Sequence, residues 1–159
     1  MKIFLIMTFF LVSGVSSQIG CRRTPDGVLS EEHYSDGSIK ERGSWIFERD
    51  ASGSLTKLQH GRWESWYRDG TKKSSLDFCN GRIVGKARFW HPNGQIAQLV
   101  PYDDDGLPHG EVKWWNSDGE LLATSRMNHG TGKEYYFHPD GLIRKEVMYT
   151  NGVPVAAER

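Results

Sequence analysis

A ten-residue segment recurs four times in this chain, and it limits the possible folds more than any other feature. The four copies are GRWESWYRDG, GKARFWHPNG, GEVKWWNSDG and GKEYYFHPDG. Their opening glycines are 24, 25 and 22 residues apart, and each copy closes on a second glycine nine residues later. Such a period indicates a repeat architecture, in which one supersecondary unit is copied and packs on its neighbours. The opening glycines are Gly61, Gly85, Gly110 and Gly132, and the closing glycines are Gly70, Gly94, Gly119 and Gly141.

Each copy reads as a β-hairpin. Two bulky residues precede an Asp-Gly or Asn-Gly pair, which is the strongest short signal for a hairpin turn. Apolar Ile96, Leu121 and Ile143 stand two residues after the turn glycine, where the return strand begins, although Lys72 takes this place in the first copy. A second turn then ends the unit. Consecutive units should therefore lie side by side and antiparallel.

We predict an all-β fold, an elongated antiparallel meander of tandem hairpin repeats of about 22–25 residues. The same pattern continues upstream in weaker form, with Asp36-Gly37 in one unit and a larger turn closing on Gly53 in the next. The predicted repeat domain spans residues 31–155, followed by a tail at 156–159. No helical periodicity of apolar residues occurs after residue 21.

The paired bulky residues form the candidate binding surface. Successive strand residues point to opposite faces, so equivalent positions of adjacent units should form aromatic ladders across the sheet. One ladder is an ordinary packed interior; a ladder left exposed would be an interaction site. The candidate residues are Trp66, Phe89, Trp90, Trp114, Trp115, Tyr136 and Phe137.

These segments resemble MORN repeats, and the aromatic pairs, Asn-Gly turns and period near 23 resemble most the variant of the YwqK-type antitoxin family. The resemblance covers residues 31–155 and implies an elongated, twisted β-meander. MORN repeats serve as scaffolds, dimerisation arms and, in some cases, lipid-binding surfaces. The antitoxin resemblance implies a toxin as partner and a place in the cytosol.

The N-terminus conflicts with a cytosolic role. Lys2 is followed by the apolar run Ile3 to Val15 and then by small and polar residues, which is the layout of a secretory signal peptide over residues 1–20. Gly20-Cys21 resembles a lipobox, in which Cys21 becomes a lipid anchor, although Gln18 does not fit that motif. Cleavage after Ser17 is the alternative. The predicted location is therefore exported: a lipoprotein on a membrane, or a periplasmic or extracellular protein, with residues 21–30 as a spacer.

The cysteine count leaves two possibilities. The chain has only Cys21 and Cys79. A lipidated Cys21 would leave Cys79 as a single thiol at a turn, whereas an unmodified Cys21 could form one disulfide with Cys79.

Composition and motifs give little support for catalysis, cofactors or nucleic acid. Basic and acidic residues number 20 each, and such a neutral chain does not suit general nucleic-acid binding. No nucleophile elbow, zinc-protease motif or phosphate-binding loop occurs. The run Asp103–Asp105 lacks the ligand spacing of an EF-hand and reads as a solvated turn. The histidines sit at repeat turns, so we expect them to lie in rows and not to converge on a metal.

The sequence thus predicts a non-enzymatic repeat module at the cell envelope that binds an unidentified protein and needs no cofactor. Two alternatives remain. An antitoxin of the YwqK type would mask a toxin. A glycan- or peptidoglycan-binding module would stack sugar rings on Trp90 and Trp115.

Overall fold

The computed structural model describes residues 27–49 and 51–155, and this part of the chain consists of strands and turns without a helix. It accordingly contains no helix that is long and apolar enough to cross a membrane. The predicted signal peptide, Cys21 and the tail lie outside the described residues. The strands are β1 (Val28–His33), β2 (Ile39–Arg49), β3 (Leu55–Trp66), β4 (Lys72–Cys79), β5 (Arg82–Trp90), β6 (Ile96–Tyr102), β7 (Gly110–Trp115), β8 (Leu121–Met127), β9 (Gly132–Phe137), β10 (Ile143–Thr150) and β11 (Val153–Pro154).

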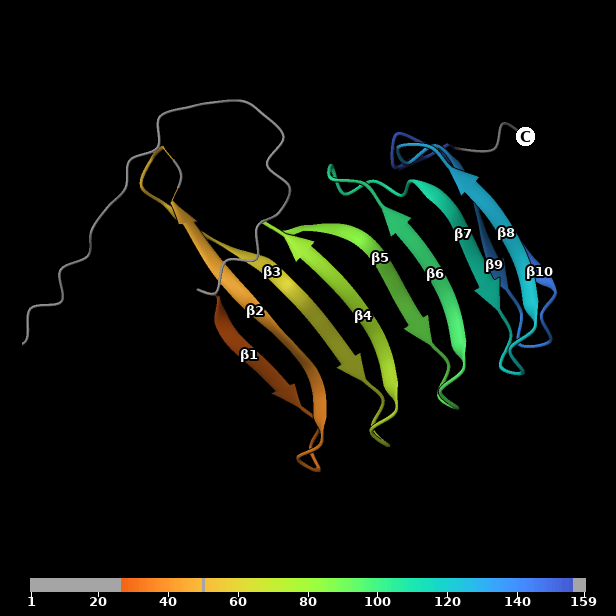
Figure 1. Ribbon diagram of the computed structural model, residues 1–159, viewed down its shortest axis with the longest axis horizontal. Helices are drawn as coiled ribbons and strands as arrows, with labels where there is room; N and C mark the ends of the chain where they lie inside the picture. Colours follow the sequence, from red (N-terminus) through yellow and green to blue (C-terminus); the bar gives the residue numbers. More distant parts are fainter. Residues whose placement is uncertain (1–26, 50, 156–159) are drawn as a thin grey trace, which may run out of the picture.

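The first eight strands form one antiparallel sheet in chain order (Figure 1). Each strand pairs with the one before it and the one after it, which confirms the predicted all-β meander. β1 begins at Val28, inside the segment that the sequence analysis gave to the spacer. β2 and β3 are the longest strands, and the enlarged turn that closes on Gly53 joins them.

Two kinds of turn alternate along the chain. The first turn of a unit follows the aromatic pair, as in Tyr67–Thr71. There the Gly70 N–H donates to the Tyr67 carbonyl at 3.0 Å, and the Thr71 N–H donates to Asp69 Oδ1 at 2.8 Å. Gly70 has a φ of 84°, whereas Asp69 is not left-handed. This turn therefore needs one left-handed residue, which glycine supplies at low cost.

Three of the second turns have two left-handed residues in succession, whereas in the turn between β6 and β7 only Gly106 is left-handed. Asn80 and Gly81 have φ angles of 50° and 81°, and the pairs His129-Gly130 and Asn151-Gly152 repeat this geometry. Left-handed pairs are typical of two-residue hairpin loops, whose twist matches that of the strands. The left-handed non-glycine residues of the described chain thus all stand at second turns.

A β-bulge lies next to the first turn in each of five hairpins. In the hairpin of β5 and β6, Phe89 pairs with Gln98 but Trp90 pairs with Ile96, so Ala97 has no partner of its own. A bulge changes the direction of the neighbouring side chains. The alternation of side chains therefore changes in the return strands, where the extra residues stand, and not in the strands that carry the aromatic pairs. The bulge residues are Lys40, Lys73, Ala97, Leu122 and Arg144.

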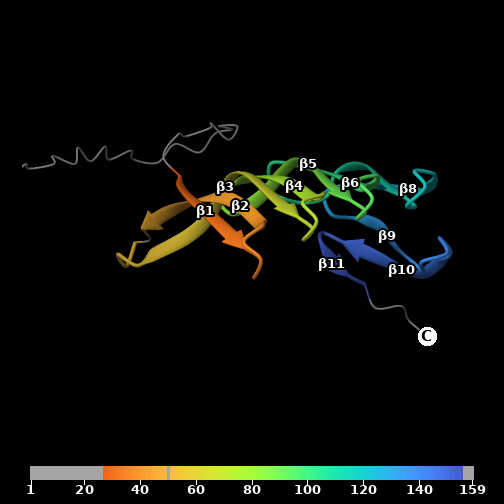
Figure 2. The same cartoon turned by 90° about the horizontal axis from the view of Figure 1, so that it is seen from below.

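The last hairpin leaves the main sheet. β9, β10 and β11 form a separate three-stranded sheet, which Figure 2 shows beneath the strands of the main layer. In the turn that joins β8 to β9, a single antiparallel bridge pairs Asn128 with Thr131. The chain then turns away at Gly132, whose φ of 152° favours glycine and where a Cβ would lie 2.7 Å from the Arg126 carbonyl oxygen.

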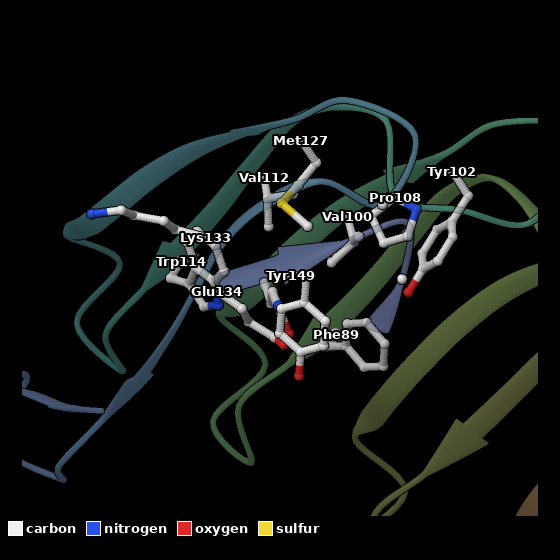
Figure 3. Close-up of a pocket in the computed structure, with 13 residues that line it drawn as sticks. Phe89, Val100, Tyr102, Pro108, Val112, Trp114, Met127, Lys133, Glu134 and Tyr149 are labelled. Atoms are coloured by element: carbon white, nitrogen blue, oxygen red, sulfur yellow. The ribbon is translucent and has the colours of Figure 1, made fainter. Parts of the chain in front are cut away.

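The hydrophobic core lies where this hairpin meets the main sheet. Trp114 is 6% exposed and its ring centroid is 5.5 Å from that of Tyr135 and 6.4 Å from that of Phe137. A cavity of about 250 Å³ remains between the layers, with Tyr149 and Glu134 directed into it (Figure 3). The buried core residues are Ala87, Val100, Val112, Trp114 and Met127.

Candidate functional site

The main open cavity lies at the edge of the molecule that carries the first turns, and we name it the first-turn cleft. Its volume is about 710 Å³. Three repeat positions supply most of its lining: the last residues of the outgoing strand, the residue after them, and the bulge residue of the return strand. These residues are Phe89, Trp90, Trp114, Trp115 and Phe137; Tyr67, His91, Asn116 and His138; and Lys73, Ala97, Leu122 and Arg144.

Both members of two aromatic pairs border the cleft, but their side chains are not placed alike. Phe89 and Trp90 are successive residues, as are Trp114 and Trp115, and in a regular strand they would face opposite sides. The extra residue of each bulge, Ala97 or Leu122, stands in the return strand and leaves this alternation in place. Phe89 and Trp114 accordingly also line the cavity between the layers, which Trp90 and Trp115 do not.

A series of hydrogen bonds between units fixes the wall of the cleft. The Tyr67 hydroxyl donates to the Trp90 carbonyl at 2.8 Å, and His91 Nε2 donates to the Trp115 carbonyl at 2.8 Å. Tyr34 makes the equivalent bond to the Trp66 carbonyl at 2.9 Å. Burial, with a smaller effect of the Asp69 charge, raises the pKa of Tyr67, which therefore stays a donor at neutral pH. Each unit thus positions the tryptophan of the next.

The charged side chains that line the cleft are both cationic. Lys73 and Arg144 stand at two bulge positions, and His91 and His138 lie at the first turns. Lys73 Nζ also lies 5.6 Å from the centroid of the Tyr67 ring. The cleft lining contains no aspartate or glutamate. Its electrostatics therefore favour ligands that carry carboxylates or other anionic groups.

The structure brings five of the seven predicted surface residues to this cleft: Phe89, Trp90, Trp114, Trp115 and Phe137. Trp66 lies outside it, with the Arg42 guanidinium 5.8 Å from its ring centroid. Tyr136 is 37% exposed and its hydroxyl donates to Glu134 Oε2 at 3.2 Å. The predicted ladder therefore stops at Trp114, and Tyr135 packs against that ring where Tyr136 was expected.

Sequence reasoning missed the bulge residues. Each of Lys73, Ala97, Leu122 and Arg144 stands three residues after a turn glycine, so a constant position was visible. Their side chains share no chemical type, so residue chemistry alone does not mark the position. The predicted turn glycines Gly70, Gly94, Gly119 and Gly141 all have φ of 84–85°, and Gly141 also borders the cleft.

A second group of polar side chains gathers at the opposite ends of the strands. Asp103, His109 and His129 each offer a ligand atom within 4.8 Å of the others. His129 Nδ1 lies 2.7 Å from Asp103 Oδ2. Partial burial raises the pKa of Asp103, but hydrogen bonds from Leu107, His129 and Asp105 outweigh it, so the pKa lies below its usual range. The expectation that the histidines would not converge is wrong for this pair.

The state of Cys79 is relevant to the two possibilities predicted for the cysteines. Cys79 ends β4 and is disulfide-bonded, and the described residues contain no free cysteine. The chain has one other cysteine, Cys21, which lies outside the described residues.

Comparison with protein families supports the repeat assignment. Residues 59–80 and 83–104 match the model of the MORN repeat variant. These segments cover most of the hairpin of β3 with β4 and of the hairpin of β5 with β6. No curated protein and no solved structure matches the chain. MORN repeats are non-enzymatic binding repeats, so the match agrees with a binding module and gives no pointer to a reaction.

Proposed function

We propose that this protein is a non-enzymatic binding module that holds an acidic segment of another protein in the first-turn cleft. The observation that carries the proposal is the cleft itself, which Trp90 and Trp115 line from equivalent repeat positions at the ends of β5 and β7, together with the cationic Lys73 and Arg144. Tryptophan and arginine are the residues most enriched at sites that dominate binding energy.

The cleft is suited to an extended chain. Its floor repeats at the spacing of successive hairpins, so a bound segment would meet similar aromatic surfaces in turn. Hydrogen bonds from Tyr67 and His91 hold those surfaces in place, which reduces the ordering cost of binding. Lys73 and Arg144 would select against basic segments, since like charges in a desolvated site are unfavourable.

Affinity chromatography with immobilised mature protein tests this function. We expect the wild type to retain one protein from an envelope extract of its host, and the double variant Trp90→Ala/Trp115→Ala to lose it. The matched control is Arg62→Ala, because Arg62 is exposed, pairs with Asp77 and lies outside the cleft. Equal retention by all three proteins would contradict the proposal.

The same experiment separates the alternatives. A retained toxin-like protein would identify the YwqK-type antitoxin function. Retention on isolated cell wall, lost in the same double variant, would identify the glycan- or peptidoglycan-binding function, because stacked tryptophans also recognise sugar rings. The cationic lining favours the acidic peptide over a neutral glycan.

We further propose that the protein acts outside the cytosol. The signal-peptide layout of residues 1–20 supports export, and the disulfide at Cys79 fits an oxidising compartment. The Cys21 thiol cannot both carry lipid and form a disulfide, so the two modifications exclude each other. Intact mass spectrometry of membrane and soluble fractions tests both points. A chain starting after Ser17 and two hydrogens lighter than the reduced form would show the disulfide, acyl mass on Cys21 would show the lipoprotein, and an unprocessed chain would overturn export.

A further inference from the structure

We propose that Asp103, His109 and His129 form a binding site for one divalent transition-metal ion of the zinc type. Nothing in the repeat match assigns a metal to this protein. The proposal rests on the geometry of these three side chains at the end of the molecule opposite to the first turns.

The three residues converge from two connections. Asp103 begins the β6–β7 connection and His109 ends it, whereas His129 lies in the turn between β8 and β9. The rings of His109 and His129 are 4.4 Å apart between centroids. Both histidines are exposed, so small side-chain rotations bring their nitrogens to one point. Zinc bonds of about 2.0 Å place ligand atoms about 3.3 Å apart. The present ligand atoms lie within 4.8 Å of one another, so shifts on the order of 1–2 Å would complete the site.

Local hydrogen bonds already orient the ligands. The backbone N–H groups of Asp105 and Leu107 donate to Asp103 Oδ1 at 3.1 and 2.9 Å, which leaves Oδ2 directed at His129. The His129 N–H donates to His109 Nδ1 at 3.3 Å, so Nε2 is the nitrogen that His109 offers. When an ion binds, the proton shared by Asp103 Oδ2 and His129 Nδ1 leaves to solvent. Such outer contacts of metal ligands commonly fix their orientation.

The repeat supplies an internal comparison. In the second turn after β4, the Asn80 N–H donates to His60 Nδ1, and the two residues are separated by 20 positions, as are His109 and His129. Asn151 and Thr131 make the corresponding contact in the last unit. The β8–β9 turn therefore has the same backbone arrangement as the turns at Asn80 and Asn151. It has His129 in the place of their asparagine. Of the described residues, only this turn combines that histidine with a neighbouring aspartate and a second histidine.

The ligand set indicates the class of ion. Two imidazoles and one carboxylate suit zinc, copper or nickel, whereas calcium and magnesium prefer oxygen ligands alone. Three protein ligands leave a fourth position for water or for a group of a partner. An ion held here would join the β6–β7 connection to the β8–β9 turn and so stabilise the point at which the last hairpin leaves the main sheet.

Isothermal titration of the tag-free, disulfide-intact, chelator-treated protein with zinc chloride tests the site. We expect one ion per chain and a rise in melting temperature with zinc, because the ion binds the folded state only. His129→Asn restores the residue found at positions 80 and 151 and should fold normally. It should weaken zinc binding by more than about tenfold and abolish the thermal shift.

His33→Gln is the control for nonspecific histidine binding, since His33 lies on β1 at the far end of the sheet. It should leave zinc affinity unchanged. NMR spectra of the imidazole groups should show zinc-dependent shifts at His109 and His129 only. Absence of saturable binding at about 1 mM zinc, or equal affinity in wild type and His129→Asn, would overturn the proposal.

Discussion

Glycine has two distinct roles in this chain, and Gly43 and Gly61 separate them. Gly43 lies under the ring of Trp63, which is 5% exposed and donates from Nε1 to the Ser44 carbonyl at 3.1 Å. A Cβ at Gly43 would collide with that ring, although the backbone of Gly43 is not left-handed. Gly61 has a φ of 71° and open space around it. Gly43 leaves room for the Trp63 ring, whereas Gly61 adopts a left-handed backbone conformation.

The two substitutions to alanine should therefore differ in cost. Gly43→Ala should destabilise the protein by about 3 kcal/mol, because Trp63 must move from a packed position. Gly61→Ala should cost about 1 kcal/mol, the strain of a left-handed alanine. Urea unfolding monitored by tryptophan fluorescence measures both. Equal losses would show that Trp63 does not depend on the close approach to Gly43.

At the scale of the hairpin, the two members of an aromatic pair have different roles, because successive strand residues face opposite sides. Trp114 packs into the core against Tyr135 and Phe137, whereas its neighbour Trp115 is half-buried and lines the cleft. The register slip between them lies just before the first turn. Equivalent residues recur in each unit. The cleft therefore continues from the hairpin of β3 and β4 to the separate hairpin of β9 and β10.

This difference predicts opposite results for two neighbouring alanine substitutions. Trp114→Ala should lower the free energy of unfolding by about 3–5 kcal/mol, as expected for removal of a buried aromatic ring. Trp115→Ala should lower it by about 1 kcal/mol or less and should weaken binding of the partner instead. Thermal or denaturant unfolding with the partner assay distinguishes them. A large loss of stability in Trp115→Ala would place that residue in the core and not in the site.

At the scale of the whole molecule, the sequence predicted what local rules determine. The hairpins, the Asp-Gly and Asn-Gly turns and the meander order follow from turn chemistry and a constant spacing. The placement of the last hairpin does not, because it depends on how Gly132 directs the chain after a short turn. The contact of His109 with His129 was missed for the same reason. Rows of equivalent residues were expected, but these two residues occupy different positions of the repeat and meet across a unit boundary.

The central claim is that the first-turn cleft is where the partner binds, and cross-linking in the living host tests it most directly. A photoreactive amino acid is placed at Ser117, which is exposed and borders the cleft, or at Lys86, which is exposed on β5 outside it. We predict that position 117 gives a covalent adduct with one protein, that position 86 gives none, and that Trp90→Ala/Trp115→Ala removes the adduct. The same adduct from both positions, or its persistence in the double variant, would contradict the claim.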